Sequence, residues 1–174
     1  MFYFVRHGIA DDAEMGSKFY RGIDMFLCKL SDEGASQIEN AAKDERLQGA
    51  DIILCSPYTR AVHSAAILSK ALGAPIAIET DLHEWSADKN FAPKSDEESI
   101  NALKEFFACR GEYPRGEERD WETVSDIRSR VTAVLRKYGS YRRVIVVGHG
   151  IVILALTGEE IPNGGVIGYE LPEE

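Results

Sequence analysis

The sequence is poor in the residues that build metal or low-complexity structures. It has only three cysteines, and Cys28, Cys55 and Cys109 show no close spacing such as Cys-x-x-Cys, which argues against a clustered cysteine metal site. Its 15 glycines and 6 prolines are spread along the chain, and no repeat or disordered tail is evident. A single domain over residues 1–174 is therefore expected, and nothing indicates an oligomeric state.

The sequence also has no excess of positively charged residues. The 20 Lys and Arg residues are outnumbered by 29 Asp and Glu residues, giving a formal net charge of −9. Nucleic acids and anionic membranes both favour basic surfaces, so neither is expected as the main partner. A small anionic substrate remains possible, because a pocket can be locally basic on an acidic protein.

Long hydrophobic runs are absent. The longest, residues 144–156, is interrupted by Gly148-His149-Gly150 and is shorter than the roughly 20 residues that span a bilayer. The first five residues are apolar but Arg6 follows at once, so no secretory leader is expected. The predicted location is the cytoplasm.

Short apolar runs at residues 2–5, 51–55 and 144–147 are typical of strands buried on both faces of a parallel sheet. Another strand is predicted at 166–171. Helical patterns separate these runs. The predicted helices cover the stretch after Ser31, residues 57–73 with Ser56 as N-cap, and residues 96–108, 124–138 and 150–156. This alternation predicts an α/β three-layer sandwich, with a mostly parallel central sheet flanked by helices.

Basic residues and histidines follow three of the predicted strands. Arg6, His7 and Gly8 follow the first strand, Arg60 lies just after the second, and His149 follows the strand at 144–147. In open α/β sheets, ligands bind beyond the carboxyl ends of the strands. Two arginines and two histidines are therefore expected to converge on one rim.

These residue types suit phosphate chemistry. A phosphate ester carries about two negative charges near neutral pH, and an Arg guanidinium offers a fork of donors that matches two of its oxygens. A histidine imidazole can attack phosphorus to form a covalent intermediate that water later cleaves. Glycines at 8, 148 and 150 are expected to allow close approach of the backbone to a ligand.

Several motifs, in order along nearly the whole chain, resemble the histidine phosphatase superfamily, also called the phosphoglycerate mutase-like family. They are Arg6-His7-Gly8, Leu30-Ser31-Asp32-Glu33-Gly34, Ser56-Pro57-Tyr58-Thr59-Arg60-Ala61, Leu82-His83-Glu84, Arg115-Gly116-Glu117, Val147-Gly148-His149-Gly150 and Ile161-Pro162-Asn163-Gly164. The combination is far more specific than a lone Arg-His-Gly triplet.

The resemblance implies a role for each matching residue. His7 becomes the phosphorylated nucleophile, while Arg6, Arg60 and His149 bind the phosphate oxygens. Glu84 protonates the leaving oxygen and then takes a proton from the attacking water. Gly8 is placed in the same substrate site, and no metal or cofactor is implied. From the residues alone, Arg21 could reach a substrate from the long loop between positions 9 and 30.

The sequence offers more than one candidate for the acid, and its electrostatic surroundings oppose the role. Neighbouring arginines lower the pKa of a carboxyl group, whereas a general acid must be protonated. Asp81 and Glu79 are nearby alternatives to Glu84.

The substrate is left open. The expected activity is hydrolysis of small phosphomonoesters. The loop Ile9-Ala10-Asp11-Asp12 after Gly8 instead resembles the small phosphohistidine phosphatases of the clan, so a phosphohistidine protein on a phosphorelay is the alternative. Mutase activity, a catalytically inactive phosphate-binding module and a metal-dependent hydrolase are less favoured.

Overall fold

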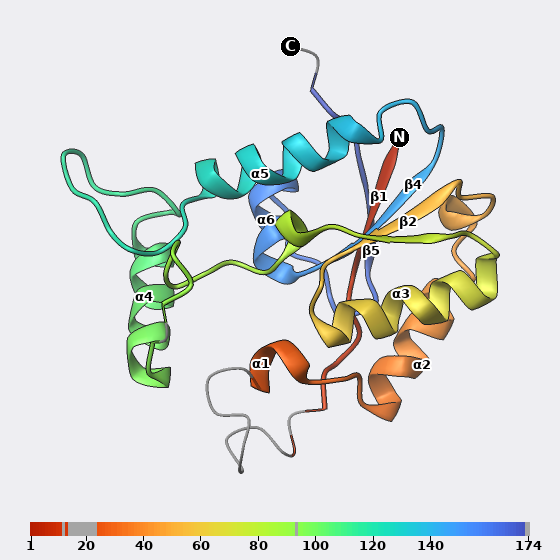
Figure 1. The fold of residues 1–174 in the computed structure, drawn as a ribbon, viewed down its shortest axis with the longest axis horizontal. Coiled ribbons are helices and arrows are strands. Elements are labelled where there is room, and N and C mark those ends of the chain that lie inside the picture. The colour runs from red at the N-terminus through yellow and green to blue at the C-terminus, as the bar shows by residue number, and fades with distance from the viewer. Residues whose placement is uncertain (12, 14–23, 93, 173–174) are drawn as a thin grey trace.

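The computed structural model describes residues 1–11, 13, 24–92 and 94–172 (Figure 1). Its centre is a five-stranded sheet. The strands are β1 (Phe2–Arg6), β2 (Ile52–Cys55), β3 (Ile76–Ile78), β4 (Val144–Gly148) and β5 (Val166–Tyr169), in the spatial order β3-β2-β4-β1-β5. The first four strands are parallel and β5 pairs antiparallel with β1, so the mostly parallel sheet predicted from sequence is confirmed.

Helices cover both faces of this sheet. The described helices of the molecule are α1 (Asp24–Leu27), α2 (Asp32–Ala41), α3 (Thr59–Leu72), α4 (Asp96–Ala108), α5 (Val124–Lys137) and α6 (Gly150–Thr157), with short 3-10 turns at Glu45–Leu47 and Thr80–Leu82. Helices α2 and α3 lie on one face and α5 and α6 on the other, whereas α4 stands beside the body of the molecule (Figure 1). The three-layer sandwich predicted from sequence is therefore confirmed.

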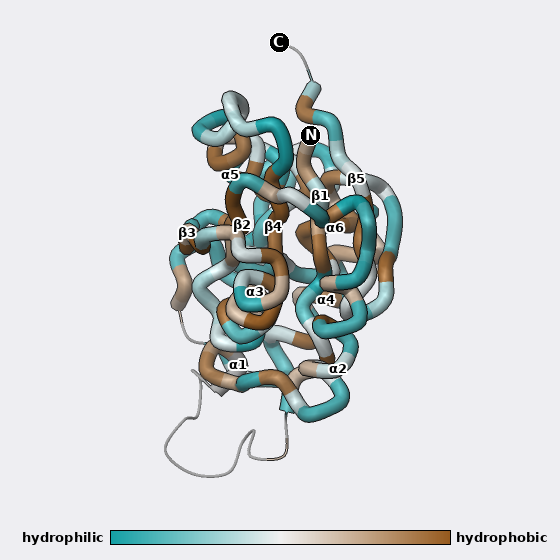
Figure 2. Tube along the Cα trace, turned by 90° about the vertical axis from the view of Figure 1, so that its right-hand side faces the viewer, coloured by the Kyte–Doolittle hydropathy of each residue, from teal (hydrophilic) through white to brown (hydrophobic). Residues whose placement is uncertain are grey.

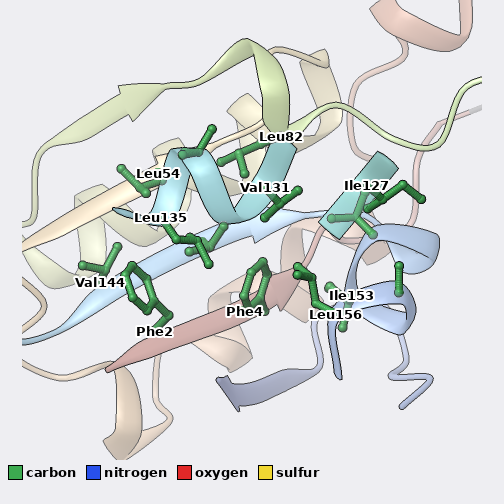
Figure 3. Close-up of a cluster of buried hydrophobic side chains, with 14 of the residues drawn as sticks. Phe2, Phe4, Leu54, Leu82, Ile127, Val131, Leu135, Val144, Ile153 and Leu156 are labelled. Carbon is green, nitrogen blue, oxygen red and sulfur yellow. The ribbon is translucent and has the colours of Figure 1, made fainter. Parts of the chain in front are cut away.

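Alternate residues of the central strands serve two separate cores. Phe2 and Phe4 of β1 point into the core beneath α5 and α6 (Figure 3), whereas Val5 joins the core beneath α2 and α3. Leu54 and Ile53 of β2 divide in the same way. A strand that feeds two cores needs apolar residues on both faces, which is why these strands are continuous apolar runs instead of alternating ones.

Colouring by hydropathy shows the same organisation. In Figure 2 the apolar segments lie along the central strands and α6, and hydrophilic segments lie toward the outside. Helix α6 carries almost no polar face: Val152 and Ile153 are buried, and Ala155 and Leu156 lie in the same core. The apolar stretch 144–156 is thus split between β4 and α6, and no helix in the described part of the chain is long and apolar enough to cross a membrane.

The start of α2 is as predicted and the start of α3 is not. Ser31 caps α2, its side chain accepting a hydrogen bond from the N–H of Gly34 at 3.0 Å. Ser56 was predicted to cap the next helix, but α3 begins at Thr59 with Tyr58 at the N-cap position and no side-chain cap. The prediction for Ser56 is wrong because its hydroxyl has a different partner in the site described below.

Strand β3 was not predicted. It is only three residues long, it lies at the edge of the sheet, and Ile76 and Ile78 are both exposed. A short edge strand needs no buried apolar run, so its sequence carries little periodic signal. The predicted last strand, 166–171, is present as β5 but ends at Tyr169.

Candidate active site

Adjacent parallel strands bring His7 and His149 together. Strands β1 and β4 pair with Arg6 opposite Gly148, so the residue after each strand emerges at the same edge of the sheet. The backbone N–H of His7 donates to the carbonyl oxygen of Gly148 at 3.0 Å, which extends the ladder by one step. The two imidazole rings consequently meet edge to face, with centroids 5.1 Å apart.

The imidazole of His7 is oriented by hydrogen bonds at both nitrogens. Nδ1 lies 2.7 Å from the carbonyl oxygen of Gly8, and Nε of Arg60 donates to Nε2 at 3.1 Å. A carbonyl only accepts and a guanidinium only donates, so Nδ1 carries the hydrogen and Nε2 the lone pair. Nε2 is therefore the nitrogen whose lone pair is available to act as a nucleophile.

His7 is held in its neutral form. Burial lowers its pKa to about 4, opposed by the hydrogen bond to Gly8 and assisted by the charges of Arg60 and Arg6. A neutral imidazole with a directed lone pair is the form that attacks an electrophile.

Arg60 connects the two histidines. It lies in the first turn of α3, is only 8% exposed, and its Nη2 donates to Nδ1 of His149 at 3.4 Å while Nε contacts His7. Its guanidinium carbon lies 5.0 Å from the ring centroid of Tyr58, which also packs edge-on against His149. This packing restricts the arginine fork to one orientation, as recognition of a tetrahedral anion requires.

The guanidinium of Arg6 is anchored at one nitrogen and unpaired at another. Nη1 donates to the carbonyl oxygen of Ile161 at 2.8 Å. Within the part of the chain that the structure describes, Nε of Arg6 is the one buried side-chain nitrogen or oxygen with no hydrogen-bond partner. Because a buried unpaired donor costs free energy, its retention here fits a site whose ligand supplies an acceptor.

Gly150 makes room for that guanidinium. A Cβ at this position would lie 3.2 Å from the guanidinium carbon of Arg6. Gly150 was predicted to let a ligand approach the backbone closely. In the structure it is the guanidinium group of Arg6 that lies close to this glycine. At Gly148, by contrast, a Cβ would meet no atom within 4 Å.

Glu84 follows the turn at Thr80–Leu82 and directs its carboxylate to the start of α6. Oε1 accepts from the N–H of Trp85 at 2.8 Å, and the N–H of Ile151 also donates to the carboxylate. Burial raises the pKa of Glu84, although these two hydrogen bonds and the charge of Arg60 oppose the shift. The arginine does lower the pKa as expected from sequence, but burial outweighs it, and the net direction suits a proton donor.

The two alternative acids are placed less well. Glu79 is occupied by Tyr138, whose hydroxyl donates at 2.7 Å, and by Lys137 at 3.0 Å. Asp81 is exposed, and its carbonyl oxygen accepts from Arg130. The geometry favours Glu84 over both.

His149 is completely buried, and Ser56 contacts it from the end of β2. Nε2 lies 2.7 Å from Oγ of Ser56. Burial, followed by the charge of Arg60, lowers the pKa of His149 well below its usual value. In this structure His149 is therefore neutral.

Two polar contacts that support His7 were not anticipated from sequence. Asn163 donates from Nδ2 to the carbonyl oxygen of His7 at 2.8 Å, across 156 positions of sequence. Ser64 accepts from the N–H of Gly8 at 3.4 Å and donates to the carbonyl oxygen of Arg60 at 2.8 Å. Asn163 belongs to a motif that the sequence analysis recognised, but the motif predicted a turn and not a contact with His7. For Ser64 the sequence offered only its position one helical turn after Arg60.

Gly8 positions its neighbours. Its N–H and carbonyl are occupied by Ser64 and His7, and a Cβ on it would lie 2.2 Å from the carbonyl oxygen of Gly34. A direct contact between Gly8 and a substrate stays a prediction. Arg21 lies outside the described residues, so its predicted role is untested.

A cavity of about 390 Å³ lies beside the segment that carries Glu84. His83, Phe91 and Arg130 are among its lining residues, but none of the residues that converge around His7 lines it. Arg130 there is already paired with the carboxylate of Glu122. The chemistry is therefore assigned to the convergent cluster instead of to this cavity.

In chemical terms, the cluster combines a neutral imidazole with a directed lone pair, two guanidinium groups, a second imidazole and a carboxyl group of raised pKa. Among the described residues, no three His, Cys, Asp or Glu side chains are grouped so as to hold a metal ion.

Comparison with known proteins gives a family and a fold. The family model described as "Histidine phosphatase superfamily (branch 1)" matches residues 2–162. A search of curated proteins finds no match.

Solved structures share the fold at low sequence identity. A mycobacterial glucosyl-3-phosphoglycerate phosphatase superposes with a TM-score of 0.65 at 22% identity, covering 90% of this chain and 77% of that one. A putative alpha-ribazole-5'-P phosphatase from Escherichia coli gives 0.63 at 21% identity, covering 95% and 87%. The alpha-ribazole phosphatase from Shigella flexneri gives 0.62 at 20%, covering 95% and 87%. At these identities the likeness establishes the fold.

Proposed function

The chain belongs to the histidine phosphatase superfamily, branch 1, and we propose that it hydrolyses small phosphate monoesters through a phosphohistidine on His7. Its general class, a phosphatase acting on phosphomonoesters, follows from the family. The assignment of roles to individual residues is our proposal. The single observation that carries it is the contact of Arg60 with both His7 and His149.

In the first step, the lone pair on Nε2 of His7 attacks phosphorus, and the bond from phosphorus to the leaving oxygen breaks. Arg60 donates to Nε2 in the free enzyme, so a bound phosphate takes over that hydrogen bond and releases the lone pair for attack. Arg6 supplies a second guanidinium, whose buried Nε has no acceptor among the described residues. Preorganised donors of this kind stabilise the charge that spreads over the phosphoryl oxygens during transfer.

Glu84 moves the protons. Its carboxyl group protonates the departing oxygen, and the resulting carboxylate then accepts a proton from a water molecule whose oxygen attacks phosphorus, while the phosphorus–nitrogen bond breaks and its electron pair returns to Nε2 of His7. Inorganic phosphate leaves, and both His7 and Glu84 return to their starting forms. The raised pKa of Glu84 supports the first of these two roles.

The acid also bears on substrate class. A phosphohistidine has a good leaving group and needs little protonation, whereas an alkyl phosphate leaves poorly without it. A half-buried carboxyl group of raised pKa therefore favours phosphomonoesters over the alternative substrate, a phosphohistidine protein. Two of the similar structures carry the names of phosphatases for a glucosyl phosphoglycerate and for an alpha-ribazole phosphate, and small organic phosphates of that kind are the substrates we propose to test.

The test is hydrolysis of p-nitrophenyl phosphate in excess EDTA by the wild type and by His7→Ala, with His63→Ala as the matched histidine control. We expect turnover that survives EDTA, disappears in His7→Ala and persists in His63→Ala. Rapid quenching with ³²P-labelled substrate is expected to trap acid-labile label on the peptide containing His7. Equal turnover by the wild type and His7→Ala would show that the nucleophile is assigned wrongly.

A panel separates the remaining alternatives. Phosphorylated sugars and nucleosides are compared with a phosphohistidine protein, each at matched concentration. Preference for the phosphoprotein would overturn the substrate class, and phosphate binding without any turnover would favour a binding module.

A further inference from the structure

The hydroxyl group of Ser56 contacts one of the two histidines of the candidate active site. Ser56 is fully buried directly after β2, and its Oγ lies 2.7 Å from Nε2 of His149. The same oxygen accepts a longer hydrogen bond, 3.3 Å, from the N–H of Tyr58. Since α3 begins only at Thr59, the hydroxyl does not cap that helix. The shortest contact of this side chain is with an imidazole 93 positions away in the sequence.

The partners of His149 define where its hydrogen lies. Nη2 of Arg60 faces Nδ1 at 3.4 Å, and a guanidinium donates but cannot accept. Nδ1 must therefore carry the lone pair, and the hydrogen of the neutral ring sits on Nε2, where Oγ of Ser56 accepts it. A serine oxygen can accept this hydrogen while its own O–H remains available to donate elsewhere.

We propose that Ser56 is a positioning residue that holds His149 as its Nε2–H tautomer, with Nδ1 turned toward the phosphate site. The inference rests on the proposed function and on the role that the family resemblance implies for His149, which is to bind a phosphate oxygen. Ser56 has no contact with the nucleophile and acts only through His149. A hydrogen bond behind a reactive imidazole is a general way of fixing both its tautomer and its orientation.

The tautomer has a consequence for binding. A phosphate oxygen beside Nδ1 would face a lone pair, so His149 must gain a proton at Nδ1 to donate to the anion. The incoming proton comes from solvent, and the hydrogen on Nε2 of His149 continues to donate to Oγ of Ser56. Binding of phosphate is therefore coupled to uptake of one proton by His149.

Other charged groups near His149 set how strongly it resists that proton in the free enzyme. Arg60 on α3 and Arg130 on α5 are cationic, and His7 and His83 add to the positive potential when protonated, all lowering the pKa of His149. Glu84, whose carboxylate accepts a hydrogen bond from the N–H of Ile151 at the start of α6, is the neighbouring acid. A phosphate dianion brings two negative charges into this group, and these charges favour the protonated form of His149.

The decisive measurement is the ¹⁵N spectrum of histidine-labelled protein, with His149 assigned from the spectrum of His149→Gln. In the free wild type we expect the Nε2–H tautomer at His149. Addition of inorganic phosphate should convert it to the doubly protonated ring. An Nδ1–H tautomer in the free protein, or a ring that stays neutral in the phosphate complex, would overturn the proposal. Neither reading depends on catalytic activity.

Two substitutions test the role of the hydroxyl. Ser56→Ala should lower kcat by about tenfold or more, as for loss of groups that orient a reacting side chain, and should mix the two tautomers of His149. Ser56→Thr retains the hydroxyl and should recover most of the rate. Ser69→Ala, on α3, is the matched serine control: it removes a 2.7 Å hydrogen bond to the carbonyl of Ala74, remote from the site, and should leave kcat unchanged.

The outcomes separate this inference from the proposed function. An unchanged tautomer and a kcat within twofold of wild type in Ser56→Ala would refute the role of Ser56 even if His7→Ala were inactive. Activity in His7→Ala would refute the nucleophile, while the tautomer of His149 would still be read directly. If Ser56→Ala fails to fold, the spectra of the wild type and Ser56→Thr decide the question.

Discussion

Gly8 and Gly34 lie with their backbones in direct contact, and neither has room for a side chain. A Cβ on Gly8 would lie 2.2 Å from the carbonyl oxygen of Gly34, and a Cβ on Gly34 would lie 2.1 Å from the carbonyl oxygen of Ile9. The start of α2 is thereby pressed against the loop that follows His7. The loop cannot move without moving the helix, so this contact restrains the loop that follows His7.

Gly34→Ala is expected to destabilise the protein and to lower its activity. Alanine ordinarily stabilises a helix relative to glycine by about 1 kcal/mol, but here the clash reverses the sign, and we expect a net loss of about 2 kcal/mol. Urea unfolding and kcat measure the two effects. Gly139→Ala is the control, because a Cβ there meets its nearest atom at 3.5 Å. A stabilised Gly34→Ala variant would contradict the close contact.

The convergence of the site could be predicted from the sequence because it depends on strand direction. Once β1 and β4 are identified as parallel neighbours, His7 and His149 must emerge at one edge. The same reasoning places Arg60 there, since it lies just beyond the end of β2. Buried parallel strands are distinctive enough in composition to be recognised individually.

The contacts behind the site could not be predicted. Ser56 precedes a proline near a helix start, and locally that pattern indicates an N-cap as strongly as any. Only the three-dimensional placement of His149 reveals the competing partner. Asn163 likewise reads as a turn residue, because nothing in its neighbourhood of sequence points to the carbonyl of His7. The direction of the pKa shift of Glu84 also depended on burial, which no local pattern reports.

Stability is expected to fall in mild acid because of His7. Its pKa is about 4 in the folded protein against 6.5 for an unperturbed histidine. Between these two values the unfolded chain binds a proton that the folded chain does not, so the free energy of unfolding falls as pH drops from 6.5 toward 4. The contribution of His7 is fully present above pH 6.5 and gone below about pH 4.

Urea unfolding at a series of pH values measures this effect. His7→Gln removes the titrating group and should give a shallower loss of stability across the same window. The difference between the two profiles isolates His7 from the carboxylates, which titrate in both proteins. Parallel profiles would mean that His7 is not held neutral by the fold.

Asn163→Ala should reduce activity more than stability. The amide donates to the carbonyl of His7 at 2.8 Å, and a single hydrogen bond of this kind contributes about 1 kcal/mol to folding. Its loss lets the end of β1 shift, and small displacements of a nucleophile are costly, so we expect kcat to fall about tenfold. Asn101→Ala, at an exposed position of α4, is the control. An equal kcat in both variants would show that the contact does not position His7.

Glu84→Gln should separate substrates by their leaving groups. Nitrophenolate leaves without a proton, whereas an alkoxide needs one. We therefore expect kcat/KM, which reports the steps through phosphorylation, to fall about 10²- to 10⁴-fold for an alkyl phosphate and far less for p-nitrophenyl phosphate. In the wild type, activity on the alkyl phosphate should decline as pH rises through the pKa of Glu84, which burial places above its usual value, and the variant should lack this decline. Glu79→Gln is the matched control, since that carboxylate is engaged by Tyr138 and Lys137. Equal losses on both substrates would show that Glu84 maintains the shape of the site and donates no proton.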